Sequence, residues 1–401
     1  MKRADFQPAA PGRLEPTTFL EHQVVDGLLQ TTHVQGFGFV PNLLPQADAP
    51  PPDYLVDLFP AILDAERSLS QLEGAASRLP NPHMLINAFS RREALLSSAI
   101  ENTFSSAEQL ALFAIDPNIT DDRNQTREVY NYACALEYGL ASELPICLRL
   151  IKEMHAILLT GIQHDGAQPG EFRVTQNAIG HANQPFSHAR YVPPPPRFLD
   201  ELLNNFEHYL HHRNPTLPRL VQFAITHYQF EAIHPFLDGN GRLGRLLITL
   251  MLCRQGQLSK PLVYVSGFFE ANRPAYYDLL LSVSRAGTWQ DWIRFFLTAV
   301  NLQAKDALER ADQLIALQTR FQNQVRQKQA SALLPGLIDY LFLNPAVSIK
   351  RVKDHLKCSH GTATNLVKRL TDLNILVEAT GRDYGKIFVC RPILNLIHNP
   401  S

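Results

Sequence analysis

The sequence predicts a mainly α-helical protein with a short β-hairpin between its helices and a small helix-turn-helix unit near its C-terminal end. Apolar residues recur at helical spacing from about residue 54 to 160 and again from 197 to 301. Glycines and prolines between these stretches break the helical pattern and bracket a short β-type run. After residue 331 the pattern is helix, short helix, turn, helix and two strands.

Composition narrows the class of protein. The 401 residues suffice for two to four domains, and 45% hydrophobic with 19% charged residues is typical of a globular protein. A net charge of −1 argues against nucleic acid bound along the whole length. Five cysteines without a CxxC spacing indicate reduced thiols. With no signal-peptide pattern and no run of about 18 apolar residues, we expect a cytoplasmic protein without a membrane span.

The sequence pattern divides the chain into successive parts. The first two are an extended N-terminal segment, 1–53, and an N-terminal helical region, 54–140. The proline run Ala49–Pro52 cannot lie inside a helix, so we expect an extended connector there. The apolar spacing of the second part predicts helices over about 55–72, 90–104 and 125–138, the first bounded by Asn81-Pro82.

The third part of the chain, 141–300, contains the short β-type run that interrupts the helical pattern. Helices are expected over about 144–160, 197–212, 216–231, 241–255, 272–286 and 288–301. Between the first two, Phe172–Ile179 is expected to form a hairpin or flap. Residues 302–330 predict a connecting helix, and 331–395 form the last part.

The segment His234–Arg245, with sequence HPFLDGNGRLGR, carries chemistry suited to a polyphosphate. Gly239 and Gly241 flank Asn240 where a loop enters a helix, whose first amides attract phosphate oxygens. Arg242 and Arg245 share a helix face and can clamp phosphates, and Asp238 is a hard ligand suited to Mg²⁺. His234, before a proline, is placed to take a hydroxyl proton.

This segment resembles the Fic family signature at every fixed position, and the resemblance extends over roughly residues 50–300. It implies a Fic-type helical bundle as the catalytic core (141–300) and transfer of AMP from ATP to a protein hydroxyl. His234 would be the base, Asp238 the Mg²⁺ ligand, and Arg242 and Arg245 the phosphate clamps. The expected ATP contacts are Gly239, Asn240 (its side chain included), Gly241, Arg242, Leu243, Gly244, Arg245, Asn272 and Tyr277, the last two near the adenine or ribose.

Two further motifs resemble parts of the same family. The stretch 169–180 resembles the flap that registers the target side chain, with Arg173, Gln176, Asn177, Ile179 and Gly180 as candidates. The pattern often has Trp after Gln-Asn, and Ala178 stands here. Ser97–Asn102 fits the inhibitory pattern Ser/Thr-x-x-x-Glu-Gly/Asn, which implies that Glu101 engages Arg245 and displaces the γ-phosphate, with Ser97 and Asn102 completing the motif.

Residues 331–395 look like a winged helix-turn-helix domain. Nine basic against five acidic residues over 330–395 give a net charge of +4, and the polar positions of the second helix are candidate DNA contacts: Thr362, Thr364, Asn365, Lys368 and Arg369. A protein-interaction or dimerisation module is the alternative, and the oligomeric state, a homodimer included, stays open. The target protein stays open too, the chain itself included.

Three alternatives to adenylyl transfer stay open from the sequence. The first is the reverse reaction, in which Glu101 orients water to remove AMP. The second is transfer of another phosphate-containing group. The third is a DNA-binding regulator in which the core only senses nucleotide, against which the intact His234 argues because sensing needs no general base.

Overall fold

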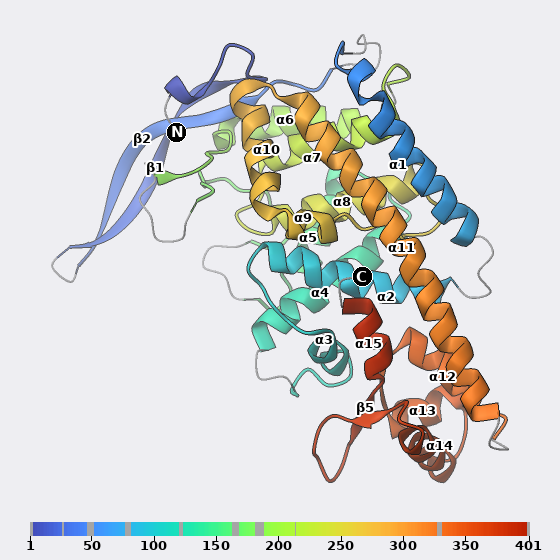
Figure 1. Cartoon of the computed structure of the whole chain (residues 1–401). Helices are drawn as coiled ribbons and strands as arrows, with labels where there is room; N and C mark the ends of the chain where they lie inside the picture. Colours follow the sequence, from blue (N-terminus) through green and yellow to red (C-terminus); the bar gives the residue numbers. More distant parts are fainter. Residues whose placement is uncertain are drawn as a thin grey trace. The chain divides into compact units, whose positions relative to one another are not determined.

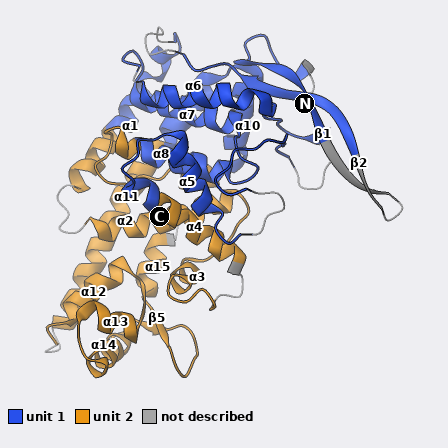
Figure 2. Ribbon diagram, turned by 180° about the vertical axis from the view of Figure 1, so that it is seen from behind, with its two compact units in different colours: residues 1–66, 137–251, 271–299 blue, residues 67–136, 252–270, 300–401 orange. Residues whose placement is uncertain are grey.

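The computed structural model describes residues 3–25, 28–45, 52–76, 82–119, 123–162, 168–180, 188–212, 214–326 and 331–398. Residue Asn81 and residues 49–51, 163–167 and 181–187 are among those outside the described residues. The chain is mainly helical (Figure 1) and divides into two compact units, each built from three stretches of sequence (Figure 2). Unit 1 comprises 1–66, 137–251 and 271–299; unit 2 comprises 67–136, 252–270 and 300–401.

Unit 1 is a helical bundle with a two-stranded sheet at its N-terminal end. Its own elements are η1 (Arg3–Asp5), β1 (Gly12–Val25), β2 (Leu28–Pro41), α5 (Leu148–Leu158), η3 (Pro196–Phe198), α6 (Leu199–His211), α7 (Arg219–Ile233) and α10 (Arg273–Ala286). The helices α1 (Leu55–Ala76), α4 (Arg123–Ala141), α8 (Asn240–Arg254) and α11 (Trp289–Arg326) begin in one unit and end in the other.

Amphipathic spacing explains how these helices pack. In α6 the buried residues are Leu199, Leu202, Leu203, Phe206 and Tyr209, which form one stripe at helical spacing. Helix α7 is buried nearly all round, with 13 of its residues buried, as expected of a central helix. The functional segment follows directly after this central helix, so its backbone begins from a rigid element.

The N-terminal hairpin differs from the expected unpaired segment. Strands β1 and β2 pair antiparallel from Gly12–Pro41 to Val25–Leu28. The Phe39 amide donates to the Val192 carbonyl at 2.9 Å, which attaches β2 to the chain before η3. The dipeptide Asp26-Gly27 between two apolar runs is the sequence signal that predicts such a hairpin. By contrast, Phe172–Ile179 forms no strand, and only an isolated bridge joins Ile179 to Tyr191.

Unit 2 contains the inhibitory-motif helix and the C-terminal region. Its own elements are α2 (His83–Ile100), α3 (Ala107–Phe113), α12 (Leu334–Leu343), β3 (Ala346–Ser348), α13 (Ile349–Leu356), α14 (His360–Asp372), β4 (Val377–Glu378), β5 (Ile387–Val389) and α15 (Arg391–His398). Helix α9 (Ser266–Ala271) belongs to this unit except for its last residue, which belongs to unit 1. The strands form an antiparallel sheet in the order β3-β5-β4. Helices α12 and α15 pack on α2, and α15 also packs on α3.

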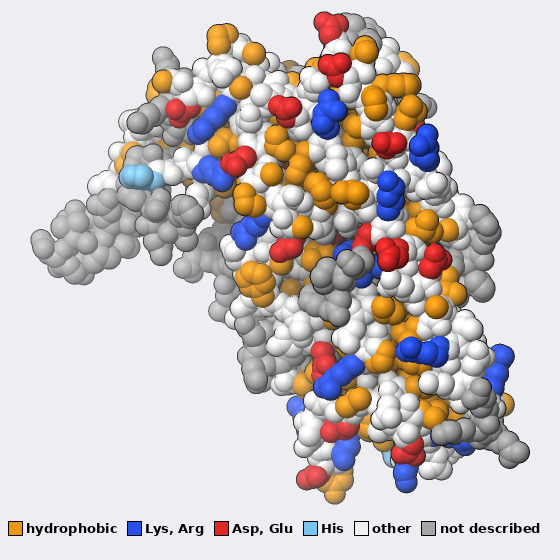
Figure 3. Space-filling model, in the orientation of Figure 1, with side chains coloured by type: hydrophobic (Ala, Val, Ile, Leu, Met, Phe, Trp, Pro, Cys, Tyr) orange, Lys and Arg blue, Asp and Glu red, His pale blue; other side chains and the backbone are white. Residues whose placement is uncertain are grey.

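Three short helices were not predicted from the sequence: α3, α9 and α15. Helix α11 was predicted as two helices, but it runs unbroken from Trp289 to Arg326 and contains both the helix expected at 288–301 and most of the connecting helix. All five cysteines are free, as expected. On the face drawn in Figure 3, acidic and basic side chains are interspersed, in keeping with the net charge of −1. Among the described residues, no helix has the length and apolar character needed to cross a bilayer.

Candidate active site

The signature segment forms the connection from α7 to α8 in unit 1. Helix α7 ends at Ile233, and His234 adopts the left-handed conformation, with φ 50° and ψ 62°. Phe236 is fully buried and anchors the connection, and α8 begins at Asn240. The sequence prediction of a loop entering a helix at this point is therefore confirmed.

The Asn240 side chain holds the turn together. Its Oδ1 accepts from the Phe236 amide at 2.9 Å, and its Nδ2 donates to the Phe236 carbonyl at 2.9 Å. At the start of α8, the Leu243 amide donates to the Gly239 carbonyl at 3.0 Å. The amides of Asn240 and Gly241 thus lie ahead of the helical ladder, where helix ends bind anions. The sequence predicted that the Asn240 side chain contacts phosphate; here its two hydrogen bonds shape the backbone.

The signature arginines are buried, which is unusual for this residue type. Arg245 is inaccessible to solvent and Arg242 is 3% exposed. Arg242 pairs with Asp238 at 3.3 Å, whose side chain is 40% exposed. Leu243 lies in the core, so its side chain is not available to a ligand. Two buried guanidinium groups on one helix favour a bound polyanion over a solvated surface.

Asp238 suits a metal that is held partly by substrate. Within the described part of the chain, no three His, Cys, Asp or Glu side chains are grouped as a metal cage. Mg²⁺ commonly binds through one or two carboxylates together with phosphate oxygens and water. The partly exposed carboxylate of Asp238 fits that mode.

Two glycines of the segment leave little room for a side chain. Gly239 has φ +80°, and a side chain there would press on Leu158 and His155. A Cβ at Gly244 would overlap the carboxylate of Glu231. These glycines bring helix α8 and its preceding loop close to α5 and α7.

His155 of α5 supports the loop and was not predicted from the sequence. Its ring stacks on Phe236 with centroids 3.7 Å apart. Nδ1 accepts from the Gly170 amide at 2.9 Å, so Nε2 carries the proton and donates to the Asp238 carbonyl at 3.0 Å. Burial lowers the pKa of His155 to about 4, which keeps the ring neutral, as this bonding requires.

His234 is also neutral at physiological pH. Its side chain is half-buried, and desolvation together with the charge of Arg173 lowers its pKa to about 3. The Glu231 backbone carbonyl and the Asp238 carboxylate act in the opposite direction. A neutral imidazole can accept a hydroxyl proton, which is the role expected of His234.

A second buried histidine lies behind the segment. His227 Nδ1 donates to the Gly244 carbonyl at 3.2 Å, so its Nε2 accepts from the Tyr276 hydroxyl at 2.9 Å. Desolvation and the charge of Arg245 lower the pKa of His227 to about 3. Tyr276, the residue before the predicted nucleotide contact Tyr277, is 1% exposed and belongs to the core.

Tyr277 and Asn272 lie at the start of α10. The Tyr277 ring is partly exposed, with the guanidinium carbons of Arg190 and Arg273 at 5.9 and 5.8 Å from its centroid. Asn272 is the N-cap residue of α10 and is partly exposed. Contact of either residue with a nucleotide stays a prediction.

The expected flap residues are held mainly by the protein itself. Gln176 accepts from the Thr17 hydroxyl at 2.8 Å and donates to the Pro193 carbonyl at 3.0 Å. Asn177 donates to the Phe236 carbonyl at 3.0 Å. Ile179 exchanges two backbone hydrogen bonds with Tyr191, at 2.8 and 3.1 Å. The side chains of Gln176 and Asn177 therefore fasten the flap to the hairpin and to the signature loop, and the backbone of Ile179 joins it to Tyr191.

The outward face of the flap contains one predicted residue, Gly180, and two that were not predicted as contacts, Val174 and Ala178. Val174 is 79% exposed, and Gly180 and Ala178 are also exposed. Val174 was not among the predicted contacts, although an exposed branched apolar residue in an extended segment is the signal that could have found it. Arg173 is buried.

The inhibitory motif lies in unit 2, at the end of α2. This helix starts at His83 and ends at Ile100, so Glu101 is its C-terminal cap. The predicted range 90–104 had placed Glu101 inside the helix, which is wrong. Asn102 has φ 62°, a conformation that glycine and asparagine adopt most easily, which explains the Gly/Asn position of the motif. Ser97 is fully buried, and Glu101 is partly exposed.

The buried carboxylate of Glu93 fixes α2 one turn before the motif. It accepts from the Tyr132 hydroxyl at 2.8 Å and from the Ser266 hydroxyl at 2.5 Å. Hydrogen bonds to a buried carboxylate are stronger than neutral ones, so this contact restrains α2 against α4 and α9.

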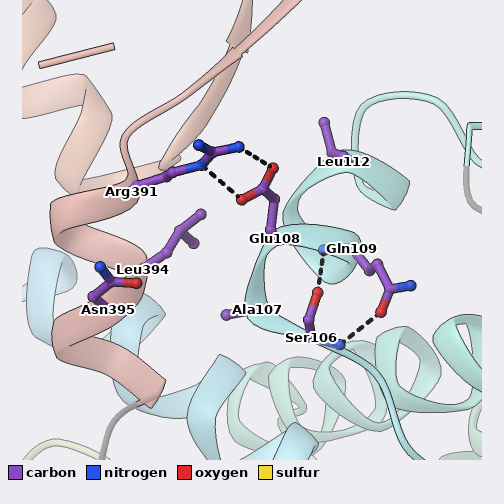
Figure 4. Close-up of a pocket in the computed structure, with 8 residues that line it drawn as sticks. All are labelled: Ser106, Ala107, Glu108, Gln109, Leu112, Arg391, Leu394 and Asn395. Carbon is purple, nitrogen blue, oxygen red and sulfur yellow. Dashed lines mark hydrogen bonds and ion pairs between the residues drawn. The ribbon is translucent and has the colours of Figure 1, made fainter. Parts of the chain in front are cut away.

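A pocket in unit 2 contains none of the sequence-predicted residues. It measures about 540 Å³ and is lined by residues of α3, its N-terminal cap Ser106 and α15 (Figure 4). Arg391 pairs with both oxygens of Glu108, at 3.2 and 3.3 Å, on one side of it. Ser106 and Gln109 form the capping box that begins α3. With its charged groups already paired, this pocket has no cation left for a nucleotide phosphate among its lining residues.

The fold and site define a class of protein: a helical bundle in which two buried arginines and a neutral histidine lie at the N-terminal end of one helix. Family comparison agrees with that class. Residues 59–141 match the model "Fic/DOC family N-terminal", and residues 145–252 match "Fic/DOC family". Two adjoining stretches of the chain thus match the two domain models of this family.

Curated relatives carry the name protein adenylyltransferase Fic. The relative from Drosophila grimshawi is 33% identical over 186 residues, covering 45% of this chain and 34% of the relative. The relative from Aedes aegypti is 32% identical over 250 residues, covering 58% of this chain and 46% of the relative. The matches thus span between a third and a half of the length of these relatives.

Solved structures share the fold. A Fic family protein from Desulfovibrio desulfuricans aligns with a TM-score of 0.52 and 21% identity, over 82% of this chain and 96% of that protein. Fic-1 from C. elegans aligns with a TM-score of 0.51 and 23% identity, over 65% of this chain and 74% of that protein. Both support a Fic-type helical bundle.

Proposed function

We propose that this chain is a protein adenylyltransferase, which transfers AMP from ATP to a hydroxyl side chain of a protein. The observation that carries the proposal is the placement of a neutral His234 and the buried Arg242 and Arg245 around the N-terminal end of α8. The hydroxyl oxygen attacks the α-phosphorus, the bond to the bridging oxygen of the β-phosphate breaks, and pyrophosphate leaves. His234 takes the hydroxyl proton.

The remaining residues of the segment act on charge and position. The amides at Asn240 and Gly241 and the two guanidinium groups stabilise charge that develops on the phosphate oxygens. Asp238 would hold Mg²⁺, which supplies charge neutralisation at the phosphates when bound. Asn272 and Tyr277 would contact the nucleoside, and the outward face of the flap, with Val174, would receive the target backbone.

We further propose that Glu101 restrains this activity by pairing with Arg245 in competition with the γ-phosphate. The support is chemical: Glu101 ends a helix that Glu93 holds in place, and its carboxylate is partly exposed. Arg245 is a signature guanidinium that an anion can pair with. Its partner would be the carboxylate in the restrained state and phosphate in the active state.

Intact-mass measurement after incubation with Mg²⁺ and ATP tests the reaction class. The wild type, Glu101→Gly and His234→Ala are compared. We expect a gain of one AMP, larger in Glu101→Gly and absent in His234→Ala. Absence of any AMP adduct in Glu101→Gly, with ATP binding intact by calorimetry, would reject self-modification. Addition of candidate targets and of an AMP-modified protein then separates transfer to other proteins from AMP removal.

DNA contact by residues 331–395 stays a separate proposal. The supporting observation is that Asn365 and Lys368 are exposed on α14, while Ala363, Leu366 and Val367 face the core. Thr362, Thr364 and Arg369 are partly exposed on the same helix. A gel shift with random duplex at low and high salt tests it, because phosphate contacts make binding weaken as salt rises. Salt-independent or absent binding would favour a protein-interaction module.

A further inference from the structure

Arg173 belongs to the flap segment, yet its side chain points into the protein and is only 3% exposed. Nε donates to the His234 carbonyl at 2.8 Å, and one terminal nitrogen donates to the carbonyls of Pro194 at 2.7 Å and Ile233 at 3.4 Å. The other terminal nitrogen donates to the Thr175 carbonyl at 3.2 Å. The guanidinium group therefore joins four backbone carbonyls from three segments of unit 1.

These carbonyls include the one that most needs a partner. His234 has a left-handed backbone, which costs a residue with a side chain about 1–2 kcal/mol and persists only where surrounding contacts fix it. Its carbonyl and that of Ile233 lie at the C-terminal end of α7, where helical carbonyls lack helical partners. The Arg173 amide also donates to the Pro235 carbonyl at 2.9 Å, so three consecutive residues are held from one position.

The bonding of Arg173 is not that of an ion pair. Among the described residues it makes no salt bridge with a carboxylate, and burial lowers its pKa to about 10. A buried charge is costly unless hydrogen bonds replace its hydration. A cation at the carbonyl end of a helix gains from the helix dipole as well. The cost of burying this charge is offset by carbonyls alone, which points to a role in fixing backbone.

From this geometry we infer that Arg173 is a positioning residue for His234. It fixes the backbone turn from which the imidazole projects, and it links that turn to the flap on one side and to the chain before η3 on the other. The inference rests on the proposed function, in which His234 takes the proton of the target hydroxyl. Because its side chain is buried, Arg173 is not available to contact a target protein, and residues on the outward face of the flap would make that contact instead.

The fork of the guanidinium group makes the inference testable. Lysine keeps the charge but offers one nitrogen on a flexible stem, which cannot reach carbonyls in three directions. Glutamine removes the charge and most of the donors. Arg173→Lys therefore separates position from charge, and Arg173→Gln removes both. Arg197→Lys is the matched control, because Arg197 is 54% exposed in its side chain and lies outside the signature segment.

The first measurement is AMP incorporation by the full chain with Mg²⁺ and ATP. We expect kcat to fall about 100-fold in Arg173→Lys, with the Kd for ATP within about threefold of wild type, because a misplaced base impairs the reaction and not nucleotide binding. Arg197→Lys should match the wild type. A kcat for Arg173→Lys within about threefold of wild type would overturn the inference.

The second measurement does not depend on catalysis, so it separates failure of this inference from failure of the proposed function. Diethyl pyrocarbonate modifies neutral imidazoles, and peptide mass spectrometry reads each histidine separately. We expect His234 to react severalfold faster in both Arg173 variants, while the buried His155 and His227 keep their wild-type rates. Unchanged His234 reactivity would refute a positioning role. Equal acceleration of all three histidines would show that Arg173 serves general stability instead, which also rejects it.

Discussion

The backbone of Phe236 offers a quantitative test of how the signature loop is held. Its carbonyl accepts from both Asn240 and Asn177, whereas its amide has Asn240 as its hydrogen-bond partner. Asn240→Ala leaves a buried amide without that partner, at roughly 1–3 kcal/mol, and removes one carbonyl hydrogen bond worth about 1 kcal/mol. We therefore expect it to lower the free energy of unfolding by about 2–4 kcal/mol, and Asn177→Ala by about 1 kcal/mol.

The double variant should be worse than the sum of its parts. Each single variant leaves the Phe236 carbonyl one donor, but Asn177→Ala with Asn240→Ala leaves it neither. An unsatisfied buried carbonyl adds a penalty, so we expect an excess of about 1 kcal/mol over additivity. Urea unfolding followed by tryptophan fluorescence measures it, because both tryptophans, Trp289 and Trp292, lie in unit 1 with the loop.

Asn205 supplies a matched control. It binds the backbone of Leu44 as Asn240 binds that of Phe236, accepting from the amide at 2.7 Å and donating to the carbonyl at 3.4 Å. Asn205→Ala and Asn177→Ala share no partner and should add within about 0.5 kcal/mol. If the Asn177 and Asn240 effects also add within that limit, the shared carbonyl does not couple the flap to the loop, and the reasoning is wrong.

Three further outcomes follow from the described contacts. His155→Phe should keep the stack on Phe236 but lose the bonds to Gly170 and Asp238. We expect AMP transfer to fall at least about tenfold, and the free energy of unfolding to fall by roughly 1–3 kcal/mol because the buried Gly170 amide loses its acceptor, checked by labelled ATP and urea unfolding. His227 has a native pKa below its unfolded value of about 6.5, so the unfolded state binds more protons and the free energy of unfolding falls as pH drops below about 6.5. His227→Gln should lessen that pH dependence by up to about 1.4 kcal/mol per pH unit. Urea unfolding from pH 7 to 5 measures it. Glu93→Leu should raise AMP incorporation by loosening the helix before Glu101, and a rate equal to wild type in a folded variant would count against that restraint.

The signature segment was predictable because its chemistry is local. His234, Asp238, Arg242 and Arg245 all lie within twelve residues, so spacing alone placed them around one helix end. The long helices were predictable as well, since their apolar stripes are continuous. The sequence could not show that the side chain of Asn240 holds Phe236, because that use depends on the loop's three-dimensional path.

Residues that act through distant partners escaped prediction. His155 lies on an apolar face of α5, where a histidine looks like a core residue, and its partners are 15 and 83 positions away. Arg173 looked like a surface contact in an exposed flap, although its acceptors are backbone carbonyls up to 61 positions away. Backbone acceptors carry no signature in the sequence of side chains, so only the folded structure reveals them.

Short elements were missed for a different reason. Helix α9 has six residues and α3 has seven, which is too few for an apolar period to emerge. The capping box of Ser106 and Gln109 was the available signal for α3. The hairpin was missed because its strands contain Pro16 and the glycines at 12, 36 and 38, residues that lower strand propensity.

The packing of α12 and α15 on α2 affects how truncated versions of this chain should be interpreted. Removing everything after residue 330 would uncover apolar side chains of the helix that ends at Glu101. A shortened chain that gained activity would thus report a disturbed α2 as readily as a lost ligand-binding module. Single substitutions on the exposed side of α14, such as Lys368→Glu, leave that packing intact and therefore test the function of the C-terminal residues alone.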